Sequence, residues 1–245
     1  MRYRLSSGWL LKKLARFPTD GRLVPLEIRI LGRTLHIYLD PHGGDRPSFF
    51  EVFYELGPDQ LPPNPPDLVI DAGAHVGFFS LLARAKYPSA TIHAFEPLPR
   101  NVELLRRHVD VNFARVSVHS AALWTENRMV EFVASKSNDG RIHQESRSDA
   151  RDTNPAVQVR SVRLGEVLPE ISRGHLLLKM DIEGAELDVL EVSLPLIGKS
   201  SMVLCELHDT ETNLPRFLSL MTRYGWSAQV LKDAGPHSYW KLSSP

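Results

Sequence analysis

The chain has 245 residues, of which 42% are hydrophobic and 24% are charged. Such a length and composition are typical of an α/β protein with one sizeable core, and no run approaches the roughly 18 consecutive apolar residues that a membrane-spanning helix needs. Lysine plus arginine equal aspartate plus glutamate at 29 each, so the overall charge gives no reason to expect nucleic-acid binding, which demands a basic surplus or stripe.

Basic and apolar residues alternate in the first segment, residues 1–16, at spacings that fit a helix. We expect this helix to cap the core. The alternative, a peripheral contact with an anionic membrane surface, stays open. Lys12, Lys13 and Arg16 interrupt any apolar centre, so we expect no signal peptide.

A hairpin and a second helix are predicted next. Residues 26–30 and 34–39 alternate apolar and polar side chains around a glycine turn, which is the pattern of a β-hairpin. The aromatic residues of 49–56 recur at helical spacing. We expect these aromatics to pack on the sheet, with the alternative that some of them roof a substrate pocket.

Prolines dominate residues 61–66 and can continue neither a helix nor a strand ladder. We therefore divide the chain into an N-terminal cap of hairpin and helices, residues 1–60, and a main domain, residues 61–245. The main domain holds all the motifs that point to a function.

The main domain opens with an apolar run that ends in an acid, passes through a small-residue turn and enters an apolar helix near Gly77. Residues 68–80 thus predict a strand, a tight loop and a crossover helix, which is the first unit of a doubly wound sheet. Gly73 and Gly77 let the backbone approach a ligand at the carboxyl end of the strand, where such sheets bind cofactors.

The spacing of this turn disfavours a dinucleotide and hence a nucleotide-dependent oxidoreductase. A dinucleotide fingerprint needs three glycines, so that bare backbone can hold the pyrophosphate. His75 and Phe78 stand at the second and third of those positions. A ligand that has an amino-acid tail and no pyrophosphate fits better, and S-adenosylmethionine is such a ligand.

The next two predicted strands supply candidates for the rest of that ligand. Residues 91–97 form a strand that ends at Glu96, about 25 residues after Asp71, where an acid binds ribose hydroxyls in nucleotide-binding sheets. Pro99 begins the following helix. The third strand, residues 116–123, ends in small residues that leave room for a flat adenine. The alternative, that these small residues only allow close helix packing, stays open.

Two further strands, residues 129–134 and 156–162, enclose a polar loop, residues 135–154, which we expect to be either functional or poorly ordered. A short helix over 164–171 follows.

A buried strand then runs from 175 into Lys179 and Asp181, which alternation places on one side. Lys179 could there hold Asp181 ionised. Glu183 and Glu186 come at the start of the next helix, where the helix dipole favours negative charge.

The strand of residues 201–209 carries Glu206 and His208 on a shared face. If consecutive strands are neighbours, these two residues and Asp181 converge.

Cys205, the single cysteine, lies in the same strand and cannot form an internal disulfide, so we expect a reducing compartment and a cytoplasmic protein. A helix stopped by Gly225 and two last strands complete the sheet.

Two motifs together resemble the FkbM family of S-adenosylmethionine-dependent class I methyltransferases: Asp71-x-Gly73-Ala74-His75-x-Gly77 and Lys179-x-Asp181-x-Glu183-Gly184-x-Glu186, with Glu206-x-His208 on the next strand. The chain departs at His75 from the generic class I motif, which has glycine there. The resemblance implies a Rossmann-like, doubly wound sheet of seven strands whose last strand is antiparallel. It also implies O-methylation of a hydroxyl on a sugar, a polysaccharide or a natural product.

We accordingly assign two sets of site residues. The expected S-adenosylmethionine site consists of Asp71, Gly73, Ala74, His75, Gly77, Glu96, Pro97, Ser120, Ala121 and Asp181. The expected catalytic residues are His208, Asp181 and Glu206. The expected partner is a small-molecule or glycan acceptor, without nucleic acid.

His208 is the predicted base, because the unperturbed pKa of histidine lies near neutrality, with Asp181 or Glu206 orienting its ring. A purely structural His208 remains an alternative. Mg²⁺ or Mn²⁺ on the carboxylates and the imidazole is a second alternative, which we do not predict. A third is a module that binds S-adenosylmethionine or another protein without catalysis.

Overall fold

The computed structural model describes residues 22–40, 44–134, 140–142, 156–167, 174–198 and 200–244. The predicted helix over residues 1–16 and most of the predicted loop 135–154 lie outside the described residues. Within the described ranges, no helix has the length and apolarity needed to cross a membrane.

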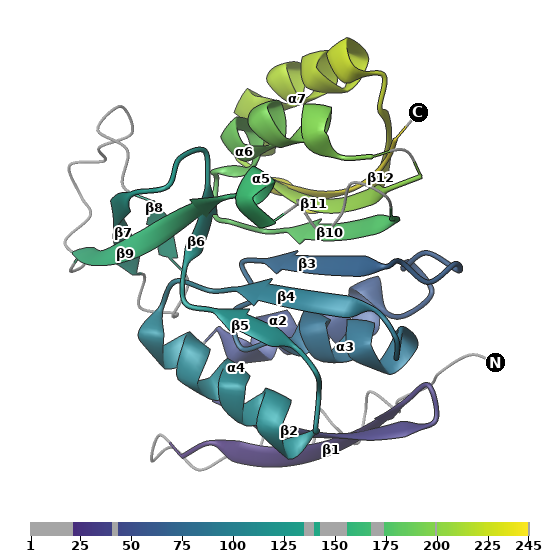
Figure 1. The fold of residues 1–245 in the computed structure, drawn as a ribbon, viewed down its shortest axis with the longest axis vertical. Helices are drawn as coiled ribbons and strands as arrows, with labels where there is room; N and C mark the ends of the chain where they lie inside the picture. The colour runs from purple at the N-terminus through teal and green to yellow at the C-terminus, as the bar shows by residue number, and fades with distance from the viewer. Residues whose placement is uncertain are drawn as a thin grey trace.

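A seven-stranded sheet forms the centre of the fold, with the strand order β12-β13-β11-β10-β3-β4-β5 (Figure 1). The strands from β11 to β5 pair in parallel, and β13 is antiparallel to β11. The predicted doubly wound α/β sheet with an antiparallel last strand is therefore confirmed. The strands are β3 (Leu68–Ala72), β4 (Thr91–Phe95), β5 (Ser117–His119), β10 (Leu176–Met180), β11 (Met202–His208), β12 (Ser227–Asp233) and β13 (His237–Ser243).

Hydrophobic cores cover both faces of this sheet. All five residues of β3 are buried, which is typical of a central parallel strand. Val69 packs with the cap and α3 (Phe78–Lys86), whereas the adjacent Ile70 packs with α6 (Glu186–Ser193) and α7 (Thr210–Tyr224). In Figure 1, α6 and α7 lie together on one side and α3 on the other, near α4 (Pro99–Val111).

The N-terminal cap forms the predicted hairpin and helix. β1 (Val24–Ile30) pairs antiparallel with β2 (Arg33–Leu39). A short α-helix, α2 (Asp45–Phe50), continues without a break into a π-helical segment, η1 (Glu51–Leu56). Phe49 and Phe53 contact the ring of Phe78 in α3, with centroid distances of 5.7 and 5.8 Å. The cap aromatics were predicted to pack on the sheet, and these two instead contact helix α3, which covers it. The boundary at residue 60 stays a prediction.

Two elements differ from the sequence-based expectation. The predicted third strand, residues 116–123, divides at Ser120: β5 ends the main sheet, and β6 (Ala122–Trp124) enters a second sheet of order β6-β9-β7-β8. The other strands of that sheet are β7 (Met129–Ala134), β8 (Gly140–Ile142) and β9 (Ala156–Arg163), and α5 (Leu164–Val167) follows. Helix α6 begins at Glu186 rather than near Glu183, because Glu183 and Gly184 have positive φ angles of 56° and 94°.

Candidate active site

The turn after β3 adopts left-handed backbone at Gly73, His75 and Gly77, with φ of 72°, 50° and 89°. A Cβ atom at Gly73 would overlap the carbonyl oxygen of Asp181, and one at Gly77 would overlap the side chain of Leu105. Packing against the backbone of Asp181 therefore requires glycine at position 73, whereas the main reason for glycine at position 77 is its positive φ, since the end of the Leu105 side chain could shift. The reason inferred from the sequence, close approach of a ligand, does not account for them on its own.

Asp71 lies behind this turn and is fully buried. Ser80 Oγ donates a hydrogen bond of 2.6 Å to Asp71 Oδ2, and Lys179 Nζ lies 4.0 Å from Asp71 Oδ1. Burial raises the pKa of Asp71, and Lys179 and Ser80 oppose this effect. The side chain thus joins the turn to α3 and β10, and its contact with a cofactor stays a prediction.

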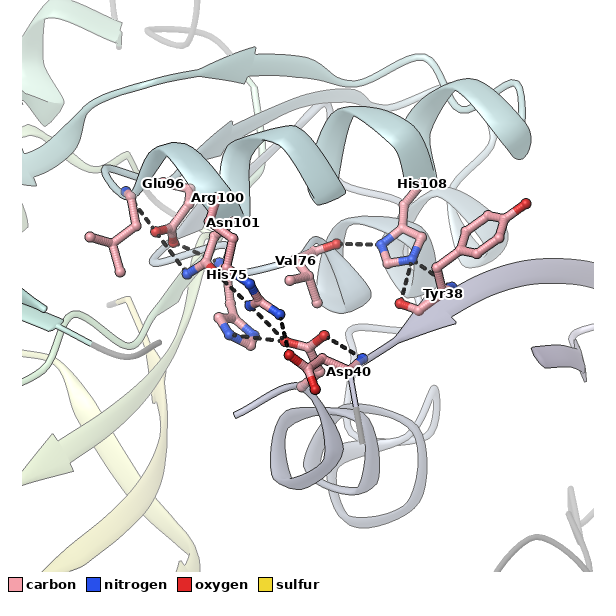
Figure 2. A network of polar contacts seen from close by, with 10 residues as sticks. Tyr38, Asp40, His75, Val76, Glu96, Arg100, Asn101 and His108 are labelled. Atoms are coloured by element: carbon pink, nitrogen blue, oxygen red, sulfur yellow. Dashed lines mark hydrogen bonds and ion pairs between the residues drawn. The ribbon is translucent and has the colours of Figure 1, made fainter. Parts of the chain in front are cut away.

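Glu96, at the end of β4, organises the turn through its two carboxylate oxygens (Figure 2). The backbone N–H of His75 donates to Oε2 at 2.9 Å, while the N–H of Leu98 and the side chain of Asn101 donate to Oε1 at 2.9 and 3.2 Å. The carboxyl is 5% exposed, and burial raises its pKa to about 7. Contacts within the chain therefore fix the Glu96 carboxylate, and its binding to a ribose stays a prediction.

Other predicted cofactor residues lie around Glu96. Ala74 is buried, and its N–H donates to Phe95 O at 2.9 Å. Pro97 is buried directly after Glu96, and Ser120 is exposed where β5 ends, followed by buried Ala121. The structure thus gathers the first-motif residues and the ends of β4 and β5 at one edge of the sheet.

His75 connects the turn to the cap. Its Nε2 lies 3.6 Å from Oδ1 of Asp45, a fully buried carboxylate at the start of α2. Asp45 also accepts the N–H of Asp40 at 2.8 Å and pairs with Arg100 at 3.4 Å. Arg100 also donates to the side-chain oxygen of Asn101, which in turn donates to Glu96, as the labelled side chains in Figure 2 show. These contacts link the cap back to the turn. Sequence reasoning missed Asp45 and Arg100, because neither belongs to a motif.

Replacing Asp45 with alanine is expected to destabilise the protein by about 2–3 kcal/mol, because the N–H of Asp40, His75 and Arg100 would all lose a fully buried carboxylate partner. Asp40→Ala is the matched control: Asp40 pairs with the same arginine at 2.8 Å from a partly exposed position, so we expect a loss of about 1 kcal/mol or less. Urea unfolding measures both. Equal losses for the two variants would contradict a special role of Asp45.

Lys179 links the two motifs. Its Nζ lies 3.0 Å from Asp181 Oδ2 and donates to Gly73 O at 2.9 Å. Burial alone would raise the pKa of Asp181, but Lys179, His208 and a hydrogen bond from Glu206 together lower it. The same acids, Asp181 first, raise the pKa of Lys179 against the effect of its own burial. The prediction that Lys179 lies on the side of Asp181 and keeps it ionised is confirmed.

His208 faces the loop that precedes α6. Its Nδ1 lies 2.9 Å from Glu186 Oε1 and its Nε2 3.4 Å from Glu183 Oε2. Glu186 is 1% exposed, and its Oε1 also accepts the N–H groups of Ile182 and Gly184. Burial lowers the pKa of His208, but the two glutamates raise it to about 12.

These contacts correct two expectations for His208. The two flanking carboxylates favour the protonated ring, which has no lone pair with which to accept a proton as a base. The groups that orient it are Glu183 and Glu186 rather than Asp181 or Glu206. The sequence did contain a signal for the pairing of His208 with these glutamates: both acids come at the predicted start of a helix. The helix dipole offered a sufficient explanation for acids at that place.

Asp181, Glu206 and His208 do converge, as predicted: side-chain polar atoms of His208 lie within 4.8 Å of both acids. Asp181 and Glu206 line a cavity of about 200 Å³. The cavity lies between η1 and the strands β10, β11, β12 and β13. Its polar lining includes Glu51, Glu55, Gln60, Lys179, Asp181, Glu206, Lys232 and Tyr239, and its apolar lining includes Val52, Leu56, Phe79, Leu204, Leu231 and Trp240. Sequence reasoning missed Glu51 and Tyr239, which lie about 190 residues apart.

Three carboxyl groups meet on the cavity wall. Carboxylate oxygens of Glu51, Asp181 and Glu206 lie within 4.8 Å of one another. Burial, followed by Asp181, raises the pKa of Glu206 to about 9 and that of Glu51 to about 7. Such a donor set has the chemistry to hold a divalent cation. We assign no metal ion to it, because the ammonium of Lys179 already neutralises Asp181 at 3.0 Å.

Comparison with known proteins gives a family match over these same motifs. The family model described as the methyltransferase FkbM domain matches residues 71–227. Methyltransferase 1 of Beauveria bassiana is 31% identical over 159 residues, which cover 57% of this chain and 64% of that protein. The 31-O-demethyl-FK506 methyltransferase FkbM of Streptomyces tacrolimicus is 26% identical over 200 residues, which cover 69% of this chain and 76% of that protein.

A solved structure agrees on the fold. The methyltransferase FkbM of Methylobacillus flagellatus superimposes with a TM-score of 0.51 and 15% identity, over 79% of this chain and 47% of that one. The likeness at this identity concerns the arrangement of strands and helices. The chain spans less than two thirds of the first relative and about half of this structure.

Proposed function

Because this chain belongs to the FkbM methyltransferase family, we propose that it is an S-adenosylmethionine-dependent O-methyltransferase that acts on a hydroxyl of a sugar, polysaccharide or natural product. One observation carries the proposal. Lys179 contacts both the first-motif turn, at Gly73 O, and the carboxylate of Asp181 on the cavity wall. The proposed cofactor site and the proposed acceptor cavity would thus lie next to each other, with Lys179 in contact with both.

The residues at the sheet edge fit the proposed cofactor. The buried carboxylate of Glu96 stands at the end of β4, where an acid binds ribose hydroxyls. Ser120 is exposed at the end of β5, and a flat ring could lie against such a small side chain. Gly73 offers its backbone, and the charged pair of Lys179 and Asp181 suits the charged groups of an amino-acid tail.

The chain's own contribution to the transfer would be positioning, exclusion of water and handling of a proton. When bound, S-adenosylmethionine supplies an activated methyl group on a sulfonium. The cavity can align an acceptor hydroxyl beside Asp181 and Glu206, and its apolar wall keeps water away. The printed name of the Streptomyces relative, a 31-O-demethyl-FK506 methyltransferase, supports a hydroxyl as the acceptor.

The binding test uses the full chain, S-adenosylmethionine and titration calorimetry. We expect saturable binding that Glu96→Gln weakens by about 10- to 100-fold, because a charged acceptor of ribose hydrogen bonds is lost. Glu27→Gln is the control, since Glu27 is exposed on the cap hairpin and should leave the affinity unchanged. Wild-type protein that binds no S-adenosylmethionine would refute the cofactor assignment.

The activity test uses S-adenosylmethionine with a labelled methyl group and a panel of methyl glycosides, polyols and hydroxylated macrolides. Label transferred to an oxygen of one panel member supports O-methylation. Label on nitrogen or carbon would replace the O-methyl assignment. Binding of the cofactor without transfer to any compound in a broad panel would favour the alternative of a non-catalytic binding module.

A further inference from the structure

The cap contributes a carboxylate to the proposed acceptor cavity. Glu51 is the first residue of η1, at the point where the α-helical backbone of α2 becomes π-helical. Short π-helical turns occur frequently at functional sites, because they redirect side chains. Here Glu51 is half-buried and lines the cavity together with Asp181 and Glu206, which come from the opposite wall.

The other two carboxyl groups of this cluster have their own partners. Asp181 is held as a carboxylate by Lys179 at 3.0 Å. Glu206 hydrogen-bonds Asp181, and two carboxyl groups can share such a bond only if one of them carries a proton. Burial and Asp181 raise the pKa of Glu206, so Glu206 carries that proton at neutral pH. Neither group is therefore available as a base.

The surroundings of Glu51 suit proton transfer near neutral pH. The charged and titratable groups that act on it are Lys179, Asp181, Glu206, Tyr239 and Glu55, and Glu55 is itself paired with Lys232 at 2.5 Å. The Tyr239 hydroxyl lies within hydrogen-bonding reach of both Glu51 and Glu206. Burial and Asp181 raise the pKa of Glu51 to about 7, where a base is most effective at neutral pH.

We propose that Glu51 is the catalytic base of the proposed methyl transfer, and this inference rests on the function proposed above. The acceptor oxygen forms a bond to the methyl carbon as the O–H bond breaks, and its proton passes to a carboxylate oxygen of Glu51. The electron pair of the broken S–CH₃ bond remains on sulfur. The N-terminal cap thus completes the active site in place of His208, whose two ring nitrogens already face Glu183 and Glu186.

The test compares Glu51→Gln with Glu27→Gln, a control on the exposed face of the cap hairpin. Calorimetry with S-adenosylmethionine should give the same affinity for both variants and the wild type. With methyl glycosides and polyols as probes, Glu51→Gln should lower turnover by about 100-fold or more and remove the fall in rate at acidic pH. A Glu51→Gln enzyme with at least half the wild-type rate would overturn the proposal.

A second readout does not depend on turnover. In protein without cofactor, labelled with ¹³C at the glutamate carboxyl groups, the resonance lost in Glu51→Gln should titrate between pH 6 and 8. Titration below pH 5 would overturn the proposal even if no probe is methylated. Wild-type protein that fails to bind S-adenosylmethionine would instead refute the proposed function, and the two failures are therefore distinguishable.

Discussion

Replacing Gly73 with alanine is expected to destabilise the protein by about 3–5 kcal/mol, from backbone strain and overpacking together. Gly73 has a φ of 72°, and an added Cβ would overlap the main-chain carbonyl oxygen of Asp181. This oxygen belongs to the backbone of the second motif, and backbone cannot move away as easily as the end of a flexible side chain could. The melting temperature should fall by roughly 6–20 °C, because about 1 kcal/mol shifts a chain of this size by 2–4 °C.

Gly32→Ala separates the two causes of this loss. Gly32, in the turn of the cap hairpin, has a similar φ of 76°, but no atom lies within 4 Å of an added Cβ. We expect this variant to lose only the strain contribution, about 1–2 kcal/mol. Thermal unfolding of both variants and the wild type measures the difference. A Gly73→Ala protein as stable as Gly32→Ala would show that the backbone at Gly73 and Asp181 does not approach as closely as described.

The second large effect is expected for Glu186→Ala, with a loss of about 3–5 kcal/mol. Glu186 is 1% exposed and accepts hydrogen bonds from His208 and from two backbone N–H groups of the preceding loop. Its removal leaves a buried imidazolium and two donors without this acceptor. Glu191→Ala is the control on the same helix. Glu191 pairs with Arg216 and Arg223 at the surface, so its loss should cost about 1 kcal/mol or less.

The effect of Glu186→Ala should depend on pH in a defined direction. The folded-state pKa of His208, about 12, lies above its ordinary value of 6.5. The stabilisation from this ion pair is therefore complete below about pH 6.5 and declines as the pH rises toward 12. Urea unfolding at pH 6, 8 and 9.5 should show the largest gap between wild type and variant at pH 6. A gap that widens with pH would contradict the protonated state of His208.

Much of the fold could be predicted because its signals are local. The acid–glycine motif after an apolar strand, the alternation in the hairpin and the stop at Gly225 each depend on neighbouring residues alone. Lys179 and Asp181 were placed on one side by the two-residue period of a strand, and the structure has them 3.0 Å apart. The break at Ser120 was missed, because a run of β-forming residues does not reveal that its second half pairs with a different sheet.

The proton states of the site could not be predicted from residue types. Histidine has an ordinary pKa near neutrality, which made His208 the natural candidate for a base. The structure encloses its ring between Glu183 and Glu186, and this raises its pKa to about 12. Glu51 carried no signal at all, because an acid in a helix of aromatic residues is usually a solvent-exposed position.

The sequence by itself determined the family, the α/β class with its antiparallel last strand, and the two motifs that meet beneath the turn. These features follow from short-range patterns of apolar, glycine and acidic residues, each of which lies within one continuous segment of the chain. Only the tertiary structure decided which carboxyl groups share a cavity and which of them hold protons. Burial and Coulombic neighbours set those states. Apart from Glu55, the titratable neighbours of Glu51 lie more than 125 residues further along the chain, and only packing brings them together.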